Sequence, residues 1–297
     1  MKAGRYVLNG KPGLFLVGND QRLLDWGALD RASVPDAVRR AAVYAMREGT
    51  DAAFCSALPV LDKFLASDGA FLREVEPLEQ GVEFQPPVRP RTFICVGLNY
   101  RDHAQESAME LPKFPLLFAK TSNAIHAHNL AVPLPPDSKQ VDYEAELAVV
   151  IGKSCSRVEA AEALDYVAGF TCANDISARD FQFADNQWYR GKSADGFGPI
   201  GPWIVAQQQV GNGSGLRIQL RLNGKVMQDS TTANLIFDVP ALIEYISRSI
   251  TLNPGDVILT GTPPGVGFAR KPPVFLQSGD KVEVEIEKIG TLVNHIS

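Results

Sequence analysis

The sequence predicts an α+β protein in which a smaller N-terminal α/β domain, residues 1–88, precedes a larger domain of mixed β-sheet, residues 89–297. The chain has 297 residues, 45% of them hydrophobic and 21% charged, a balance typical of a globular protein with a substantial core. Three prolines between residues 86 and 90 indicate an extended linker over residues 85–91. Strand patterns dominate after this linker, and two helical patterns precede it.

The segment before the linker combines short strands with helices. Residues 5–8 and 14–17 have the pattern of strands. Ser33 can cap a helix over residues 35–48, with Gly49 as its end, and a second helix is expected over residues 52–66. The segment contains no histidine and no dense acidic cluster. We therefore assign it to scaffolding, support or dimer contact.

Alternating and continuously apolar runs after the linker are typical of buried strands. Asn223 and Gly224 predict a hairpin, because both residues tolerate the positive φ angles of a type I′ turn. Asp238 can cap a helix that has Pro240 in its first turn. The expected strands are residues 92–98, 143–151 and 167–173, with hairpins over 218–228 and 282–294.

Composition and charge exclude several classes of function. The net charge is −5, with 29 Lys and Arg against 34 Asp and Glu, so the chain offers no general attraction to nucleic acid. The apolar runs fall far short of the roughly 18 residues that span a bilayer, so we expect no membrane association. The first residues lack the apolar core of a signal peptide, and we predict a cytoplasmic protein. The four cysteines have no CxxC spacing, which favours buried, reduced thiols.

An acidic strand is the most informative feature. Side chains alternate faces along a strand, so Glu144 and Glu146 point the same way about 7 Å apart, while apolar neighbours cover the other face. Asp175 follows the strand at 167–173, just before a short helix whose entry at Ser177 resembles a capping box. Three oxygen donors without histidine or cysteine suit Mg²⁺ or Mn²⁺. The alternative is an acidic, solvated sheet face.

A histidine and a glutamate follow the first strand of the larger domain. His103 and Glu106 are three residues apart on an expected helix, so they share one face. A carboxylate beside an imidazole raises its basicity, which suits a general base that activates water. Gly97 and two later prolines would let this segment act as a hinged lid. The alternative is an exposed ion pair on a solvated helix.

A glycine-rich loop carries Lys192, which there can donate to a developing oxyanion. By itself, such a sequence is more often a mobile surface loop.

Taken in order, these segments resemble the fumarylacetoacetate hydrolase family from about Thr92 to the C-terminus, with a smaller family-like N-terminal domain ahead. The stretches that carry the resemblance are 97–106 (GLNYRDHAQE), 118–120 (FAK), 142–147 (DYEAEL), 173–182 (ANDISARDFQ), 191–193 (GKS), 201–203 (GPW) and 260–267 (TGTPPGVG).

The resemblance implies a homodimer with a catalytic domain built on a rolled, mixed β-sheet. It implies that Glu144, Glu146 and Asp175 hold Mg²⁺ or Mn²⁺ and that the substrate is a small 2-oxo acid. His103 and Glu106 would form the water-activating pair on a closing lid. The groups expected around the substrate are Lys192 and Gln182 beside the attacked carbonyl, and Lys120, Tyr189 and Thr262 at its carboxylate and carbonyl oxygens.

These residues lead us to expect a divalent-metal-dependent hydrolase that cleaves a carbon–carbon bond in a 2,4-diketo acid. An acylpyruvate, a fumarylpyruvate or a diketo-deoxy sugar acid, from aromatic or sugar acid catabolism, would be the substrate. Hydroxide generated by His103 would attack the distal carbonyl, and Lys192 would stabilise the oxyanion.

Two alternatives stay open. One is a decarboxylase or isomerase of a related 2-oxo acid such as oxaloacetate on the same scaffold. The other is a catalytically silent binding protein. His103 and Glu106 favour hydrolysis or decarboxylation over isomerisation, since isomerisation needs no activated water.

Overall fold

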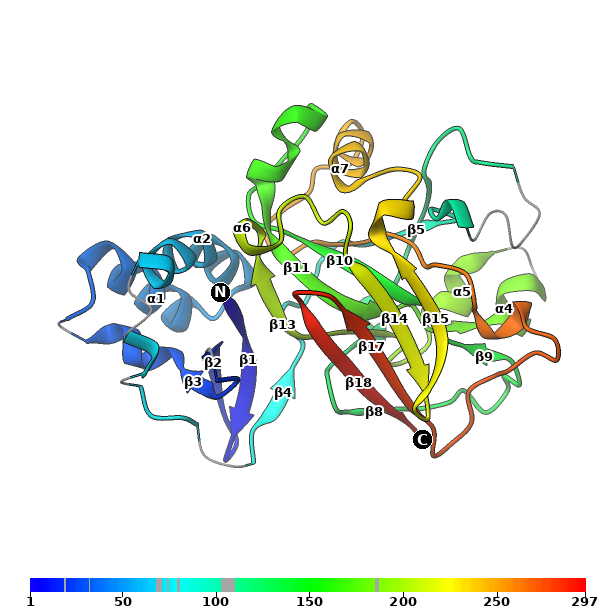
Figure 1. Cartoon of the computed structure of the whole chain (residues 1–297), viewed down its shortest axis with the longest axis horizontal. Coiled ribbons are helices and arrows are strands. Elements are labelled where there is room, and N and C mark those ends of the chain that lie inside the picture. The colour runs from blue at the N-terminus through cyan, green and yellow to red at the C-terminus, as the bar shows by residue number, and fades with distance from the viewer. Residues whose placement is uncertain are drawn as a thin grey trace.

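The computed structural model describes residues 1–18, 20–31, 33–67, 71–73, 75–78, 81–102, 110–184 and 187–297. These residues form an α+β structure of mixed β-sheets with few helices (Figure 1), which confirms the predicted fold class. The helices are α1 (Asp36–Glu48), α2 (Asp51–Ser67), α4 (Arg179–Ala184), α5 (Trp188–Lys192), α6 (Gln207–Val210) and α7 (Val239–Ser247). Short 3-10 turns are η1 (Trp26–Asp30), η2 (Phe71–Arg73), η3 (Ser122–Ala124), η4 (Ala160–Tyr166), η5 (Thr232–Asn234) and η6 (Gly267–Ala269).

The largest sheet has 11 strands and runs through both predicted domains. Most neighbours are antiparallel, and β5 runs parallel to β16. In spatial order the strands are β3 (Leu23–Asp25), β2 (Lys11–Val17), β1 (Lys2–Leu8), β13 (Gly198–Ala206), β11 (Val167–Asn174), β10 (Ala145–Ile151), β16 (Val257–Leu259), β5 (Phe93–Gly97) and β6 (Leu116–Ala119), with β4 (Glu83–Gln85) beside β1 and β7 (Ile125–His126) beside β13.

A second sheet of five strands packs against the centre of the first. Leu147 and Val149 of β10 share one apolar core with Ile218 and Leu220 of β14. Burial of apolar side chains between the two sheets is the main force that holds them together. The strands are β15 (Lys225–Thr231), β14 (Arg217–Leu222), β17 (Lys281–Ile286), β18 (Gly290–Ile296) and β8 (Ala131–Val132), and β12 (Ser177–Ala178) pairs separately with β9 (Val141–Asp142).

The central strand β10 is buried on both faces. Ala148 and Val150 point away from the second sheet and share a core with Leu58 and Leu61 of α2. The N-terminal segment therefore covers the other face of the main sheet. It also extends that sheet, because β1 pairs with β13 through Lys2. The division at residues 88 and 89 stays a prediction.

Several local predictions can be compared directly with the structure. The turn between β14 and β15 has positive φ at Asn223 (51°) and Gly224 (80°), and Asp238 caps α7 by accepting the Ala241 N–H at 3.0 Å. Gly49 ends α1 in the left-handed conformation. The proposed cap at Ser33 is wrong, because Pro35 occupies the N-cap position of α1, with φ −55° and the non-helical ψ of 139° that is typical of an N-cap. The four cysteines are free and buried, as expected.

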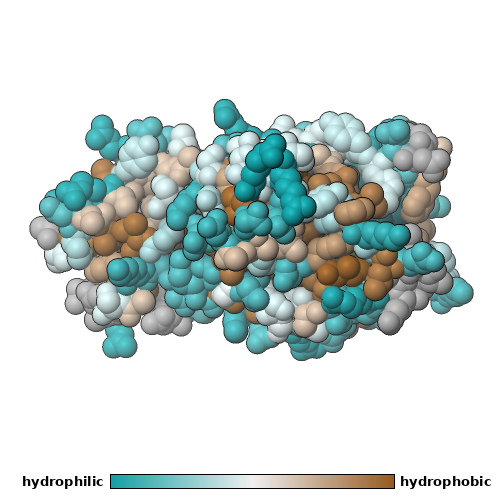
Figure 2. Space-filling view, turned by 90° about the horizontal axis from the view of Figure 1, so that it is seen from above, coloured by the Kyte–Doolittle hydropathy of each residue, from teal (hydrophilic) through white to brown (hydrophobic). Residues whose placement is uncertain are grey.

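Hydrophobic surface is spread over the molecule in patches, on the side of α1 and α2 and in the opposite half of the molecule (Figure 2). Among the residues that the structure describes, no helix combines the length and apolar character needed to cross a bilayer.

Candidate active site

Three carboxylates converge where β10 and β11 meet. Glu146 lies in β10, Glu144 is the residue directly before β10, and Asp175 is the residue directly after β11. The antiparallel register and a hydrogen bond from the Asp175 N–H to the Glu144 carbonyl, at 2.9 Å, bring the two strand ends together. One ligand oxygen of each carboxylate lies within 4.8 Å of the others, and all three residues are buried. Their burial excludes the alternative of a solvated acidic face.

Two cations hold Glu144 in its charged form. The Lys192 ammonium lies 2.8 Å from Glu144 Oε2 and 2.7 Å from Asp175 Oδ2, and Arg179 Nη2 lies 2.6 Å from Glu144 Oε1. Burial alone would raise the pKa of Glu144, but Lys192 and Arg179 lower it to about 2. Burial would likewise lower the pKa of Lys192, yet Asp175 and Glu144 raise it above its ordinary value. The two carboxylates therefore favour the charged form of Lys192.

A glycine allows Lys192 to reach this position. A Cβ at Gly191 would lie 2.8 Å from the Ala178 carbonyl oxygen and 2.8 Å from the Gln182 nitrogen. Only a residue without a side chain lets α5 pack this closely on α4 and β12. This close packing explains why the 191–193 motif has glycine at position 191.

Glu146 is held differently from its two neighbours. Its Oε2 accepts the Gly261 N–H at 2.6 Å. Burial, followed by repulsion from Asp175 and Glu144, raises the pKa of Glu146 well above its ordinary value. A divalent cation between the three carboxylates would remove this repulsion and let all three ionise.

The charges of the described residues fit a divalent cation. Four buried carboxylates face three buried cations, which leaves one negative charge in excess. A divalent ion together with one carboxylate of a substrate would neutralise the cluster. Oxygen-only donors suit a hard ion. The carboxylates are Asp142, Glu144, Glu146 and Asp175, and the cations are Lys120, Arg179 and Lys192.

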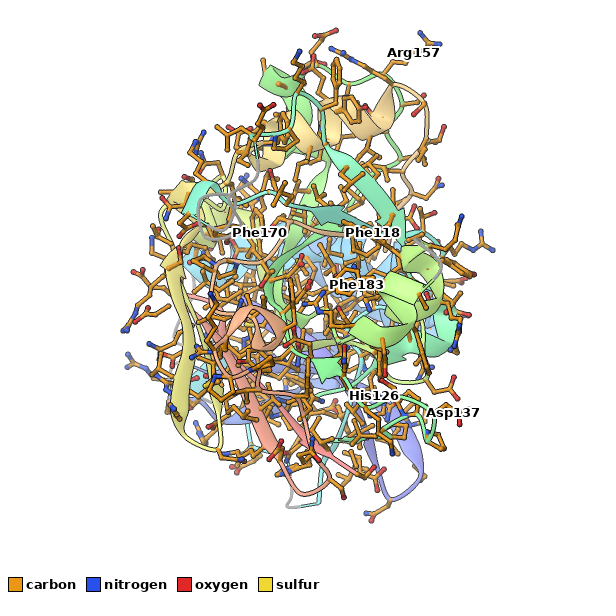
Figure 3. The ribbon with its side chains drawn as sticks, turned by 90° about the vertical axis from the view of Figure 1, so that its right-hand side faces the viewer. Phe118, His126, Asp137, Arg157, Phe170 and Phe183 are labelled. Carbon is orange, nitrogen blue, oxygen red and sulfur yellow. The ribbon has the colours of Figure 1, made fainter. Side chains whose placement is uncertain are left out.

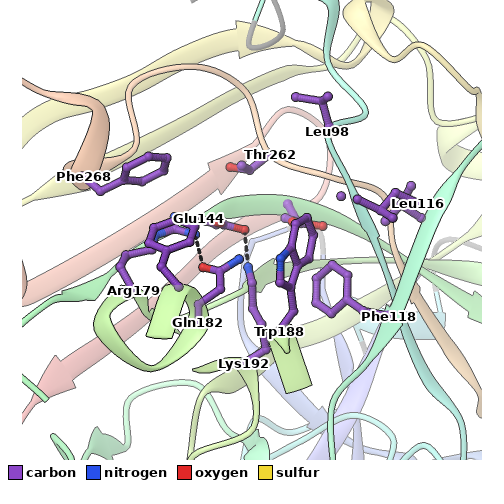
Figure 4. Close-up of a pocket in the computed structure, with 14 residues that line it drawn as sticks. Leu98, Leu116, Phe118, Glu144, Arg179, Gln182, Trp188, Lys192, Thr262 and Phe268 are labelled. Atoms are coloured by element: carbon purple, nitrogen blue, oxygen red, sulfur yellow. Dashed lines mark hydrogen bonds and ion pairs between the residues drawn. The ribbon is translucent and has the colours of Figure 1, made fainter. Parts of the chain in front are cut away.

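A cavity of about 240 Å³ opens onto these groups. Its volume lies below the ~300–1,000 Å³ of sites for drug-sized ligands, so it fits a small molecule. Figure 4 shows the polar groups between two sets of apolar side chains, Trp188 and Phe118 on one side and Phe268 on the other. The polar lining consists of Glu144, Glu146, Arg179, Gln182, Lys192 and Thr262.

Other sequence-predicted substrate residues occupy different places. Gln182 and Thr262 line the cavity. Lys120 lies behind Asp175, where its ammonium contacts Asp175 Oδ1 at 2.7 Å and both side chains are fully buried. Lys120 thus supports a carboxylate where the resemblance implied a contact to substrate. Tyr189 is 56% exposed and is absent from the described cavity lining. His103 and Glu106 lie outside the described residues.

The proposed capping box at Ser177 is wrong. Ser177 belongs to β12, and its hydroxyl donates to the Asp175 carbonyl at 3.0 Å. The strand pairing with β9 takes the backbone that a helix cap would need. Ser177 instead fixes the turn that carries Asp175.

Residues 92–297 match the family described as Fumarylacetoacetate (FAA) hydrolase C-terminal. The chain belongs to the fumarylacetoacetate hydrolase family. Its fold agrees with two solved structures, each of which matches over nearly the full length of both chains. A fumarylacetoacetate hydrolase from Exiguobacterium antarcticum is 32% identical with a TM-score of 0.81, covering 100% of this chain and 99% of its own. A 5-carboxymethyl-2-hydroxymuconate delta-isomerase from Mycobacterium smegmatis is 33% identical with a TM-score of 0.74, covering 100% and 98%.

Among curated relatives of this family member, the rat protein named Oxaloacetate tautomerase Fahd2a, mitochondrial, is 47% identical over 221 residues, which cover 74% of this chain and 71% of the rat protein. The Fumarylacetoacetate hydrolase domain-containing protein 2 homolog of Dictyostelium discoideum is 48% identical, covering 74% of this chain and 75% of its own. A human relative, 46% identical over 75% of this chain and 71% of its own, is also named an oxaloacetate tautomerase.

These relatives overturn the expected reaction. The prediction of a hydrolase that cleaves a carbon–carbon bond in a 2,4-diketo acid is wrong, because relatives at 46–47% identity are named oxaloacetate tautomerases. The physical reason is that a chelated 2-oxo acid and a fixed lysine serve both reactions. Their presence therefore does not distinguish hydrolysis from proton transfer.

Sequence reasoning missed the residue that links most of this family site. Arg179 donates from Nε to Asp142 Oδ2 at 3.0 Å and from Nη1 to Gln182 Oε1 at 3.0 Å, besides its pair with Glu144. Its guanidinium carbon lies 4.5 Å from the centre of the Phe268 ring. The available signal was the position of Arg179 in the 173–182 motif, four residues after the Asn-Asp pair.

Asp142 and Gln228 are two further supports. Asp142 accepts the Gly267 and Phe268 N–H groups at 2.7 and 3.1 Å. Gln228 accepts the Ala145 N–H and donates to Thr262 Oγ1, both at 2.8 Å. Together they fasten the 260–268 loop beside the carboxylates.

Proposed function

We propose that this protein is a divalent-metal-dependent enol–keto tautomerase acting on oxaloacetate or a closely related 2-oxo acid. The observation that carries the proposal is the identity of 46–47% to proteins named oxaloacetate tautomerases, combined with a buried carboxylate triad in a small cavity. The similar protein from Mycobacterium smegmatis is likewise named an isomerase.

Glu144, Glu146 and Asp175 would hold the ion, and we propose Mg²⁺ or Mn²⁺ because the donors are all oxygens. When bound, such an ion would draw electron density from the carboxylate and 2-oxo oxygens of the substrate, which makes the adjacent carbon more acidic. Each other contribution comes from the side chains of the chain itself.

Lys192 is placed to stabilise negative charge on the reacting oxygen. Its ammonium is fixed by Glu144 and Asp175 and lines the cavity. A donor that is already oriented does not need to reorganise as charge develops in the transition state. We therefore assign Lys192 to the enolate oxygen.

Two polar side chains are oriented by supporting residues. Arg179 donates to Gln182 Oε1, which leaves Nε2 as the donor end of the Gln182 amide. Gln228 donates to Thr262 Oγ1, so the Thr262 O–H is directed to another acceptor. Both residues line the cavity, and we propose that they donate to substrate oxygens.

Tautomerisation moves one proton from the enol oxygen and adds one at carbon 3, and it consumes no water. The pair His103 and Glu106 therefore need not activate water, although an imidazole is also suited to proton transfer at neutral pH. That role, the homodimer and a cytoplasmic location stay predictions.

The test follows the loss of the enol of oxaloacetate by its ultraviolet absorbance, with Mg²⁺, with Mn²⁺ and with a chelator. Tautomerisation that is accelerated by metal and abolished by chelator would support the proposal. Lys192→Met should lower the rate by about two orders of magnitude, whereas Lys281→Met, which removes a half-exposed ammonium from β17, should not change it. Release of carbon dioxide in place of tautomerisation would show a decarboxylase, and no change in oxaloacetate would refute both.

A further inference from the structure

One wall of the cavity is aromatic and tightly packed. Trp188 of α5 packs edge-on against Phe118 of β6, with 5.3 Å between ring centres. A Cβ at Gly97 would lie 2.5 Å from the Trp188 ring, so the ring occupies the space that only glycine leaves open. Leu98 and Leu116 continue this wall (Figure 4).

A second aromatic pair stands on the opposite side. Phe183 of α4 and Phe268 of η6 meet edge-on with 5.8 Å between ring centres, and both line the cavity. Phe183 is 52% exposed, which places it at the mouth. Figure 3 shows Phe118 and Phe183 on the same side of the molecule. The space between the two pairs is therefore apolar on both sides.

The aromatic wall begins next to the carboxylate triad. The Lys192 ammonium hydrogen-bonds Glu144 and Asp175 and also lies 5.1 Å from the centre of the Phe118 ring. A 2-oxo acid whose carboxylate and keto oxygens face the triad would thus direct its carbon 3 substituent towards the aromatic side chains.

Cations that could receive a second carboxylate are already engaged. Among the described lining residues the cations are Arg179 and Lys192, and each makes ion pairs with two buried carboxylates. A carboxylate placed against the ring faces of Trp188 and Phe118 would lose water without gaining a charged partner there, which is costly. An aryl or alkyl group would gain contact area at the same place.

We propose that the cavity takes 2-oxo acids with an apolar, and especially an aryl, substituent on carbon 3, and that the protein tautomerises them. The inference rests on the proposed tautomerase function and specifies its substrate class. Phenylpyruvate is the probe. In the step, the enol O–H bond breaks and the carbon 2–oxygen bond becomes the keto double bond. The electron pair of the carbon 2–carbon 3 double bond takes up a proton at carbon 3, which leaves a single bond there, so no oxidant, reductant or co-reactant is needed.

The experiment compares phenylpyruvate and oxaloacetate on the same metal-loaded protein by loss of enol absorbance, and measures binding of each by calorimetry. We expect phenylpyruvate to be tautomerised with a KM no higher than that of oxaloacetate. Turnover of oxaloacetate without turnover of phenylpyruvate, or with a higher KM for phenylpyruvate, would overturn this inference and leave the proposed function intact. Turnover of neither acid refutes the proposed function. Calorimetry then decides the inference, because tighter binding of phenylpyruvate than of oxaloacetate supports the predicted preference, and equal or weaker binding overturns it.

Variants of Trp188 test the contact itself. Trp188→Ala should raise the KM for phenylpyruvate roughly tenfold, as expected for loss of one aromatic contact, and should raise the KM for oxaloacetate by a smaller factor. Trp188→Phe, which keeps a ring, should recover most of the loss. Tyr44→Ala, an exposed aromatic residue of α1, is the control and should change neither value. Equal effects of Trp188→Ala on both acids would contradict the proposed wall.

Discussion

Substitution of Lys120 tests whether the stability of the carboxylate triad depends on the buried cation behind Asp175. Its ammonium contacts Asp175 Oδ1 at 2.7 Å, and both side chains are 0% exposed. It also donates to the carbonyl oxygens of Ile176 at 3.1 Å and Phe197 at 2.8 Å, and to that of Lys192. Lys120→Met keeps a similar volume but removes every one of these hydrogen bonds.

The expected loss is large because a buried carboxylate would lose its partner. Breaking a buried ion pair by removing one member costs about 3–5 kcal/mol. The control Lys281→Met breaks a pair with Glu283 on the surface, whose lysine is 46% exposed, and such pairs contribute about 0–1 kcal/mol. Lys120→Met should therefore lower the urea midpoint by roughly 1 M or more, and the control should leave it nearly unchanged.

The assay is urea unfolding in the presence of chelator, followed by circular dichroism, with KM measured on the folded variant. If Lys120→Met and Lys281→Met have midpoints within experimental error of each other, Lys120 does not stabilise Asp175 and this reasoning fails. A raised KM with unchanged stability would instead favour the contact to substrate that the family resemblance implied.

Three further predictions concern other parts of the site and fold. Glu146→Gln keeps the side-chain shape but removes a charge from the triad, so we expect at least a tenfold loss of Mn²⁺ affinity, measured by calorimetry. The control is Glu283→Gln, which changes a half-buried glutamate of β17 and should leave the Mn²⁺ affinity unchanged. Gly261→Ala should lower stability and activity more than the control Gly279→Ala. Both glycines have positive φ (100° and 93°), but only a Cβ at position 261 meets a neighbour, Asn99 Cβ at 2.8 Å. Equal losses in the two variants would contradict this. Burial lowers the pKa of His128 to about 4, and its Nδ1 accepts the Val293 N–H at 3.0 Å. The unfolded chain therefore binds this proton first, near pH 6.5, and stability falls by up to about 3 kcal/mol as the pH drops from 6.5 to 4. His128→Asn should remove most of that loss in thermal unfolding at the two pH values, and an unchanged pH dependence would show that other groups cause it.

The sequence by itself determined the elements whose signals are local. Alternation along one strand placed Glu144 and Glu146 on the same face, and Asn223 with Gly224 specified a type I′ turn. Asp238 and Gly49 marked helix ends by hydrogen bonding and by φ. The order of several motifs identified the family. Apart from the motif order, which spans the larger domain, each of these depends on residues that are close in the chain, so pattern and local geometry suffice.

Only the tertiary structure decided what each charged group does. Lys120 is 55 positions away from Asp175 in the sequence, and its role as a support follows from β6 and β11 lying in one sheet. Arg179 connects Asp142, Glu144 and Gln182 because β9, β10 and α4 meet around it. The aromatic wall likewise combines β5, β6 and α5. The function of a charge depends on its distance from other charges and on its burial, and folding sets both. The reaction class was misjudged because a chelated 2-oxo acid and a fixed lysine serve both hydrolysis and proton transfer, and the similarity to proteins named oxaloacetate tautomerases corrected it.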